Sequence, residues 1–328
     1  MTQRDIDVSI LIVSYNTIEL TCACIQSILD QTHAVKYEII VVDNGSTDGS
    51  VEMLKQRFPA CILLCQDRNL GFARATNIAA QHASGTYLLL LNSDTVVLDE
   101  AIDRLHAFAL KKPESGIWGG RTVFDDGSLN PTSCWNRQTP WSLLCRASYL
   151  SAAFRSSRLF NPEAIGGWRR DSQRNVDIVT GCFFLISAQL WKQLIGFDPH
   201  FFMYGEEADL CLRARELGVT PRITPDATII HHGGRSETAQ ADKLTRLLTS
   251  RIALTNRHWR IYWRWWGRAM HWLWMLRNLL IWRIFAFLHI ASAADRSACY
   301  RTVWHRRKQW LSGIHSELHT DEDQCTHD

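Results

Sequence analysis

Short apolar runs and stretches with helical spacing alternate along the first hundred residues. The apolar runs, which have the length of β-strands, lie at residues 8–16, 37–43, 61–66 and 86–92. The stretches between them, at 17–30, 51–58 and 69–85, place apolar side chains on one face of a helix. Strands and helices in this alternation form a mostly parallel sheet with helices on both faces, so the predicted fold class is α/β.

Polar residues gather where the predicted strands end. They are Ser14-Tyr15-Asn16, Asp43-Asn44-Gly45, Asp67-Arg68-Asn69 and Asn92-Ser93-Asp94. Open α/β sheets bind ligands beyond the carboxyl ends of their strands, so these residues mark the expected ligand edge. No GxGxxG or P-loop follows the first strand. A divalent cation on Asp94, Mg²⁺ or Mn²⁺, is therefore the simplest device for neutralising the phosphates of a nucleotide.

The middle of the chain is less regular. Residues 100–123 have the pattern of a further helix and strand, whereas residues 124–175 show no sustained period. A long aperiodic insert of this kind is typical of a functional loop or a mobile segment. Regular patterning returns at 176–187 and again at 196–218.

Composition narrows the class of protein. Of the 328 residues, 46% are hydrophobic, which is enough for a large core, and the formal net charge of +3 argues against a polycation that binds nucleic acid. The ten cysteines form no CxxC pair, which favours reduced and mostly buried thiols such as Cys22, Cys24 and Cys211 over a zinc site or disulfides. The polar N-terminus shows no secretory signature, so we expect a cytoplasmic protein.

Six segments, in this order, resemble the successive motifs of the family 2 glycosyltransferases with the GT-A fold. They are VSILIVSYN, IIVVDNGSTDGS, NLGFARATN, LLLLNSD, GFDPHFFMYGEEADLCLR and IIHHGGRS. The last two are most similar to the rhamnosyltransferase-like bacterial branch, and the likeness covers roughly residues 6 to 240. The resemblance implies an inverting transferase that uses a nucleotide-diphospho-sugar and a divalent cation.

The resemblance also assigns roles to single residues. Asp43 matches an Asp that binds the base or ribose, and Asp94 matches the last Asp of the DxD-type metal motif, in which Asn92 replaces the first. His231 matches a His that completes the metal shell in relatives. The other residues that match nucleotide-binding positions are Ser14, Tyr15, Asn69, Gly71, Arg74 and Asn77.

Inverting transfer needs a base that takes the proton of the acceptor hydroxyl. The family has Glu-Asp at this place, and its second residue is the base. Here the pair is Glu206-Glu207, so Glu207 takes that role. The extra methylene of Glu207 leaves open whether Glu206 carries the proton instead.

Each of these side chains also has a structural alternative. Asp94 and Asp43 are both residue types that form turns, and Asp43 is well placed for an Asx-turn. Glu207 is favoured at a helix start by the helix dipole. His231 has the alternative of a satisfied core histidine, and Arg74 that of a solvated helix charge.

Residues 256–290 differ from the rest of the chain. Nine Trp lie after residue 255, interrupted by arginines. With no clean run of about 20 apolar residues, a spanning helix is disfavoured. Trp and Arg at helical spacing favour amphipathic helices lying on an anionic membrane surface. A helical hairpin on the catalytic domain, or a homo-oligomer interface, is the alternative.

The expected organisation has two parts. Residues 1–245 form the GT-A catalytic domain, with a nucleotide-binding half at 1–98 and an acceptor half at 99–245 that contains the insert 124–175. Residues 246–328 form a Trp- and Arg-rich helical extension that attaches to the cytosolic face of the inner membrane.

The sequence predicts an enzyme that transfers one sugar. The expected donor is dTDP-rhamnose or a UDP-hexose, and the expected acceptor is a lipid-linked glycan of bacterial surface polysaccharide, either O-antigen or exopolysaccharide. A sugar nucleotidyltransferase is disfavoured because SYNTIEL is no glycine-rich loop. A non-catalytic, membrane-bound scaffold derived from a transferase is the other alternative.

Overall fold

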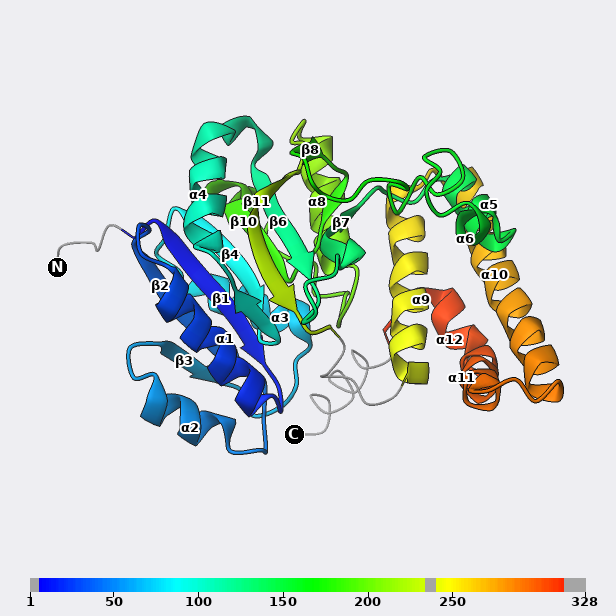
Figure 1. Cartoon of the computed structure of the whole chain (residues 1–328), viewed down its shortest axis with the longest axis horizontal. Helices are drawn as coiled ribbons and strands as arrows, with labels where there is room; N and C mark the ends of the chain where they lie inside the picture. Colours follow the sequence, from blue (N-terminus) through cyan, green and yellow to red (C-terminus); the bar gives the residue numbers. More distant parts are fainter. Residues whose placement is uncertain (1–5, 234–239, 316–328) are drawn as a thin grey trace, which may run out of the picture. The chain divides into compact units, whose positions relative to one another are not determined.

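The computed structural model describes residues 6–233 and 240–315 of the chain (Figure 1). The chain forms two compact units, and we describe each by itself. Unit 1 contains residues 1–136, 169–199 and 206–236, and unit 2 contains residues 137–168, 200–205 and 237–328.

One mixed sheet forms the centre of unit 1. Its strands, in spatial order, are β3 (Ile62–Cys65), β2 (Tyr37–Asp43), β1 (Val8–Ser14), β4 (Tyr87–Asn92), β10 (Phe183–Ser187), β6 (Ile117–Val123), β11 (Arg222–His231) and β5 (Thr95–Val97). The short strand β8 (Arg174–Asn175) pairs with β11. β7 (Cys134–Trp135) and β9 (Ile178–Val179) form a separate pair.

The first four strands are parallel, and three of them, β1, β2 and β4, are mostly buried, which explains their continuous apolar sequences, whereas β3 at the edge of the sheet is partly exposed. β1 lies parallel to β2 and β4 in unbroken register, and most of its side chains are buried. Parallel strands covered on both faces lack the alternation of half-exposed strands. The predicted α/β class is thereby confirmed.

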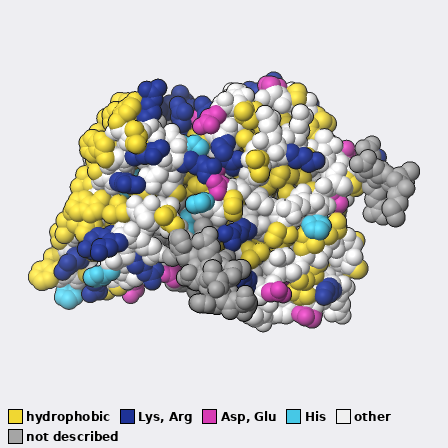
Figure 2. Space-filling model, turned by 180° about the vertical axis from the view of Figure 1, so that it is seen from behind, with side chains coloured by type: hydrophobic (Ala, Val, Ile, Leu, Met, Phe, Trp, Pro, Cys, Tyr) yellow, Lys and Arg dark blue, Asp and Glu magenta, His cyan; other side chains and the backbone are white. Residues whose placement is uncertain are grey.

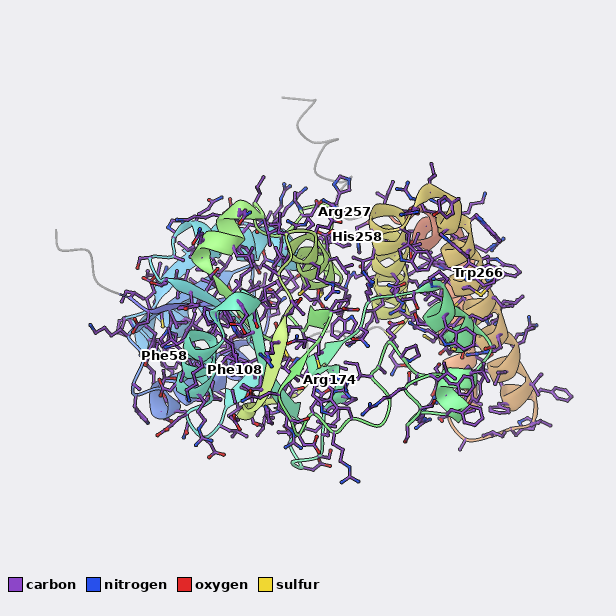
Figure 3. All side chains as sticks on the ribbon, turned by 90° about the horizontal axis from the view of Figure 1, so that it is seen from above. Phe58, Phe108, Arg174, Arg257, His258 and Trp266 are labelled. Atoms are coloured by element: carbon purple, nitrogen blue, oxygen red, sulfur yellow. The ribbon has the colours of Figure 1, made fainter. Side chains whose placement is uncertain are left out.

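Helices cover both faces of the sheet (Figure 1). Those of unit 1 are α1 (Ile18–Gln31), α2 (Ser50–Arg57), α3 (Phe72–Gln81), α4 (Ala101–Lys111), α7 (Ala188–Gln193) and α8 (Glu206–Glu216). α1, α2 and α4 share one core with alternate residues of β1, to which Phe58 and Phe108 contribute (Figure 3). α3 packs on β1 and β2 without entering that core, so it lies on the other face.

Two antiparallel pairings bring late segments of the chain to the end of β4. β10 lies between β4 and β6 and is antiparallel to both. β5 is antiparallel to β11, and in this register Thr95 lies opposite His231. The last residue of β11 is therefore held next to the turn that follows β4.

Unit 2 is helical. It contains α5 (Pro140–Ala147), α6 (Leu150–Ala153), α9 (Gln240–His258), α10 (Ile261–Phe287), α11 (Ala293–His305) and α12 (Arg307–Ser312). Its core gathers Leu248, Ile252, Met275, Val303 and Trp310 from four of these helices. α9 and α10 approach closely at Gly267, where an added Cβ would lie 2.4 Å from Thr255 Cγ2.

The segment that the sequence predicted to be irregular contains two helices. Residues 124–175 contain α5, α6, one 3₁₀ turn at Pro131–Ser133 and the short strands β7 and β8, and residues 137–168 belong to unit 2 rather than to the sheet. α5 packs against α10, and Trp266 Nε1 donates to the carbonyl of Pro140 (Figure 3). A contact between segments 126 residues apart leaves no periodic signal in either one. The predicted boundary at residue 245 stays a prediction.

In the described part of the chain, no helix combines the length and the apolar character that crossing a membrane requires. Every described cysteine is a free thiol, and Cys22, Cys24 and Cys211 are buried as predicted.

Candidate active site

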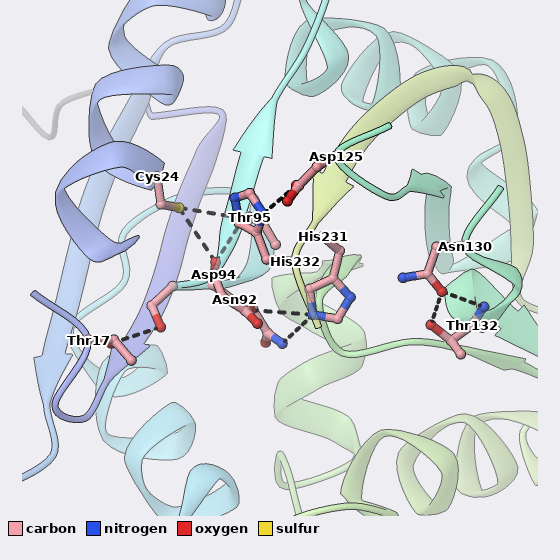
Figure 4. A network of polar contacts seen from close by, with 11 residues as sticks. Thr17, Cys24, Asn92, Asp94, Thr95, Asp125, Asn130, Thr132, His231 and His232 are labelled. Atoms are coloured by element: carbon pink, nitrogen blue, oxygen red, sulfur yellow. Dashed lines mark hydrogen bonds and ion pairs between the residues drawn. The ribbon is translucent and has the colours of Figure 1, made fainter. Parts of the chain in front are cut away.

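The carboxylate of Asp94 and the imidazole of His231 meet at the end of β4 (Figure 4). Asp94 Oδ1 lies 3.3 Å from His231 Nε2, and the Asp94 side chain is almost fully buried. The backbone N–H of His232 donates to the Asp94 carbonyl at 3.1 Å. The pairing of β5 with β11 therefore fixes both partners through backbone as well as side chain.

Asn92 belongs to the same group. Its Nδ2 lies 3.5 Å from His231 Nε2, at the last residue of β4. The structure thus brings Asn92 and Asp94 of the DxD-type motif together with His231 of a later motif, an arrangement that the family resemblance implies. The adjacent His232 is turned the other way and pairs with Asp125, as alternation along a strand requires.

The environment sets the charges of this pair. Burial alone would raise the pKa of Asp94, but the hydrogen bond and the charge of His231 outweigh it, and the pKa lies below the ordinary value. Burial would lower the pKa of His231, whereas the Cys182 sulfur and the Asp94 carboxylate raise it to about 10. Asp94 is therefore an anion at neutral pH.

The spacing of the two side chains fits a divalent cation. Adjacent ligands of an octahedral ion with bonds of about 2.1 Å lie roughly 3 Å apart, close to the 3.3 Å between Asp94 and His231. A carboxylate and an imidazole are both ligands of Mn²⁺-type ions, and metal would displace the proton of the imidazole. Among the described residues, no group of three or more His, Cys, Asp or Glu side chains is placed to hold a metal.

Hydroxyl groups link the end of β1 to this motif. Ser14 Oγ is buried and lies 2.9 Å from Thr21 Oγ1, and Thr17 Oγ1 lies 3.3 Å from Ser93 Oγ. Ser14 therefore acts within a hydroxyl cluster, while Tyr15 beside it is exposed. Thr17 was missed by the sequence reading, because a helix-capping Thr gives no signal of a contact 76 residues away.

Asp43 has a carboxylate oxygen without a partner. Its Oδ2 accepts from the backbone N–H of Ser46 at 2.9 Å, three residues on, so Asp43 caps the turn after β2, although the bond spans one residue more than an Asx-turn. Its Oδ1 is buried and has no hydrogen-bond partner in the described structure. A buried acceptor in this state is costly unless a ligand donates to it, so Asp43 is both a turn residue and a candidate ligand contact.

Asn44 organises the loop that carries Asn69 and Gly71. Asn44 Nδ2 donates to Asn69 Oδ1 at 2.9 Å, and Asn44 Oδ1 accepts from the backbone of Leu70 at 3.0 Å. Asn69 Oδ1 also accepts from the N–H of Gly71, whose φ of 81° suits glycine. The sequence reading did not single out Asn44, although its place directly after Asp43 was the available signal.

Arg74 and Asn77 lie on α3. Asn77 exchanges two hydrogen bonds with the backbone of Phe197: its Nδ2 donates to the carbonyl at 2.8 Å, and its Oδ1 accepts from the N–H at 2.9 Å. The structure therefore places the Asn77 amide on the segment before α8 and not with the strand-end group. Arg74 is half-buried on the same helix.

Glu206 and Glu207 begin α8, and both are buried. Glu206 Oε2 has no hydrogen-bond partner among the described residues. Burial, and after it the charge of Glu207, raise the pKa of Glu206 well above its usual value. Glu206 is therefore held towards its neutral form, which leaves Glu207 as the better proton acceptor of the two.

The peptide 181–182 connects Glu207 with the metal motif. A Cβ added to Gly181 would lie 3.8 Å from Cβ of Glu207, and the Cys182 sulfur acts on His231. Adjacent residues thus touch the candidate base and the candidate metal ligand. Further along α8, Arg213 pairs with Asp209 at 2.7 Å and donates to the carbonyl of Gly196 at 2.8 Å, which ties the helix to the segment before it.

Comparison with known proteins agrees with this geometry. The family model described as glycosyl transferase family 2 matches residues 9–194, more than half of the chain. The chain belongs to this family. It is a hexosyltransferase-type glycosyltransferase, and the parallel sheet with its antiparallel late strands is the GT-A fold.

Two curated relatives illustrate what the transferase is similar to. It is 28% identical over 285 residues to the N-acetylglucosaminyl-diphospho-decaprenol L-rhamnosyltransferase of Mycobacterium tuberculosis, covering 79% of this chain and 85% of that protein. It is 30% identical over 123 residues to the UDP-Glc:alpha-D-GlcNAc-diphosphoundecaprenol beta-1,3-glucosyltransferase WfgD of Escherichia coli, covering 37% and 48%.

A solved structure shares the fold. The mannosyltransferase PcManGT from Pyrobaculum calidifontis, solved in complex with GDP-Man and Mn²⁺, superposes with a TM-score of 0.54. The match covers 94% of this chain and 86% of that chain at 19% identity. At this identity the likeness shows the fold.

Proposed function

We propose that the protein transfers one sugar, with inversion, from a nucleotide-diphospho-sugar to a lipid-linked glycan in bacterial surface polysaccharide biosynthesis. The observation that carries this proposal is the buried pair of Asp94 and His231 at the end of β4, with Glu207 one peptide away. The two curated relatives support the acceptor class, since both are named for a diphospho-polyprenol-linked sugar.

Asp43 is proposed to bind the nucleotide. Its buried, unpaired Oδ1 is an acceptor for an N–H of the base or a hydroxyl of the ribose. The donor is proposed to be dTDP-rhamnose or a UDP-hexose. The names of the relatives, an L-rhamnosyltransferase and a UDP-Glc-dependent glucosyltransferase, support these two classes.

Asp94 and His231 would hold Mg²⁺ or Mn²⁺, with water and diphosphate oxygens in the remaining positions. When bound, the cation neutralises charge on the departing nucleoside diphosphate. The acceptor oxygen attacks the anomeric carbon, the bond from that carbon to the diphosphate breaks, and Glu207 takes the hydroxyl proton. Neutral Glu206 beside it keeps a second negative charge away from the leaving group.

The C-terminal unit is proposed to lie on the cytosolic face of an anionic inner membrane. α10 exposes apolar side chains as well as burying them, and Figure 2 shows hydrophobic side chains gathered on that side of the unit. The most exposed are Ile261, Trp265, Ile284 and Phe287, and exposed Arg260 and Arg283 lie on or beside the same helix. Trp and Arg together suit the headgroup region of a bilayer.

A transfer assay with the whole protein tests the proposal. We expect Mn²⁺-dependent formation of a disaccharide lipid from a nucleotide sugar and a synthetic GlcNAc-diphospho-lipid. NMR of the product should show that the anomeric configuration of the transferred sugar is inverted relative to the donor. Glu207→Gln should retain donor binding and lose roughly 10²–10⁴-fold in turnover. Glu216→Gln, at the exposed end of α8, is the control and should keep the turnover of the wild type. Donor binding without transfer to any acceptor would favour the scaffold instead.

A further inference from the structure

Unit 2 contains a partly buried group of charges that the transfer reaction does not use. Arg251 forms a two-point ion pair with Glu163, with Nη1 2.7 Å from Oε1 and Nη2 2.8 Å from Oε2. Arg251 Nε donates to His271 Nε2 at 3.2 Å, while His271 Nδ1 lies 2.8 Å from the carbonyl of Gly267. Burial and the neighbouring arginines lower the pKa of His271 to about 3, so this imidazole is neutral.

Two further arginines add positive charge without a matching carboxylate. The guanidinium of Arg146 lies 4.6 Å from the ring of Trp274, and no hydrogen bond of that guanidinium is found within the described structure. Arg277 donates to the carbonyls of Arg146 and Ala147 at the end of α5 and lies over the ring of Tyr149. Burial and the charge of Arg251 lower the pKa of Arg146 to about 9.

This arrangement is short of negative charge. Among the residues that the structure describes, three guanidinium groups face one carboxylate, which leaves an excess of two positive charges where burial limits their hydration. Isolated buried charges are unfavourable unless an ion of opposite sign joins them, and guanidinium groups pair well with phosphate. The side chains of Arg251 and Glu163 keep 17% and 18% of their surface exposed, so an anion can reach the group.

The segment that contains Arg146 and Glu163 exposes apolar side chains. Exposed Trp141, Tyr149, Phe154 and Leu159 lie on the segment that contains α5 and α6. Residues 152–157 of the same segment line an open hollow of about 590 Å³. A ligand that satisfies both features has a doubly charged anionic head and a hydrocarbon chain.

We propose that Arg146, with Arg251 and Arg277, binds the diphosphate of an isoprenoid lipid at this apolar surface. The inference deepens the proposed function and rests on it for the identity of the acceptor. The phosphate oxygens would accept hydrogen bonds from the guanidinium of Arg146. The isoprenoid chain would lie along the exposed aromatic side chains. The sugar end of the acceptor is then free to extend from the anchored diphosphate.

Vesicle binding of the full chain tests this assignment. Three vesicle types are compared in EDTA, which removes metal-dependent diphosphate binding at Asp94: phosphatidylcholine, phosphatidylcholine with farnesyl diphosphate, and phosphatidylcholine with phosphatidylglycerol of equal total charge. We expect the wild type to prefer the diphosphate vesicles, and Arg146→Gln to reduce that preference by about tenfold or more. Exposed Arg301→Gln on α11 removes the same charge and should leave the preference intact.

A second pair of variants separates a loss of binding from a loss of folding. Arg146→Lys keeps the positive charge but lacks the planar two-point donor of a guanidinium. It should show an intermediate preference for the diphosphate vesicles at an unchanged melting temperature. Glu163→Gln removes the one competing carboxylate and should strengthen binding to the diphosphate vesicles. A wild type without preference, or an Arg146→Gln protein that keeps it, would overturn the proposal.

Two further measurements distinguish a lipid diphosphate from free pyrophosphate as the ligand, and distinguish the arginine site from the proposed transfer reaction. If inorganic pyrophosphate displaces the protein from the diphosphate vesicles at the concentration of the lipid itself, the site serves a free anion and the lipid assignment is wrong. In transfer assays, Arg146→Gln should raise KM for the lipid acceptor and leave KM for the donor unchanged. An absence of any transfer would refute the proposed function, while the vesicle result would still decide the arginine site.

Discussion

At the scale of single residues, the protonation states of two buried carboxyl groups decide what the site can do. Asp94 is buried yet held ionised by His231, while Glu206 is buried without such a partner and is held towards its neutral form. Two carboxyl groups of one protein thus differ because one has a cationic neighbour and the other an anionic one. This difference supports the proposal that Glu207, rather than Glu206, is the proton acceptor.

The raised pKa of Glu206 implies that the free energy of unfolding depends on pH. Folded Glu206 keeps a proton that the unfolded chain releases above about pH 4.5. The free energy of unfolding should therefore be greatest below that pH and should fall as the pH rises towards the folded pKa. Glu206→Gln should remove this decline, so that its melting temperature gains on that of the wild type between pH 4.5 and pH 8.

Differential scanning fluorimetry across this range measures the effect. Glu216→Gln, at the exposed C-terminal end of the same helix, is the matched control and should follow the wild type. Parallel curves for the wild type and Glu206→Gln would show that Glu206 is ionised in the folded protein.

At the scale of elements, strand ends were predictable and the contacts between distant segments were not. β1, β2 and β4 are buried on both faces, so their apolar sequences identified them and the polar residues that follow them. The register of β5 against β11, which brings His231 to Asp94, has no local signature. Only the resemblance to a family indicated in advance that His231 lies beside Asp94, at the proposed metal site.

Asn77 shows the same limit. A resemblance of motifs placed it beside the nucleotide, but its amide is engaged by Phe197, 120 residues further along. A polar residue on a helix gives no hint in the sequence of such a distant partner.

We expect Asn77→Ala to lower the free energy of unfolding by about 1–3 kcal/mol, because two backbone groups of Phe197 lose their partner. Urea denaturation measures this loss, and Gln81→Ala at the exposed end of α3 is the control. The affinity for the donor should change by less than about threefold. A large loss of donor affinity at full stability would instead restore a direct nucleotide contact.

At the scale of the whole molecule, composition predicted an unusual C-terminal part but not its partner. Residues 137–168 join the C-terminal helices, and Arg277, one of the arginines expected to face lipid, instead binds carbonyls at the end of α5. Counting Trp and Arg along a sequence does not distinguish inward from outward residues on a helix that is apolar on all sides. The structure makes that distinction for α10.

The outward residues of α10 allow a test of membrane attachment. Trp265 and Phe287 are 62% and 83% exposed, so replacing both by Ser should leave the fold intact. Sedimentation with anionic vesicles should then fall by about tenfold or more, since two large apolar side chains no longer enter the bilayer. Leu110→Ser, at an exposed apolar position of unit 1, is the control. Unchanged sedimentation of the double variant would contradict attachment through α10.

The most direct measurement is a calorimetric titration of the wild type and Asp94→Asn with UDP-, dTDP- and GDP-sugars, each with Mn²⁺ and with EDTA. We expect the wild type to prefer one nucleotide and to bind it strongly only with Mn²⁺. Asp94→Asn keeps the shape of the side chain but loses its charge, and it should lose most of that metal-dependent gain. Equal affinity with Mn²⁺ and EDTA, or an unchanged Asp94→Asn protein, would contradict a metal site at Asp94 and His231.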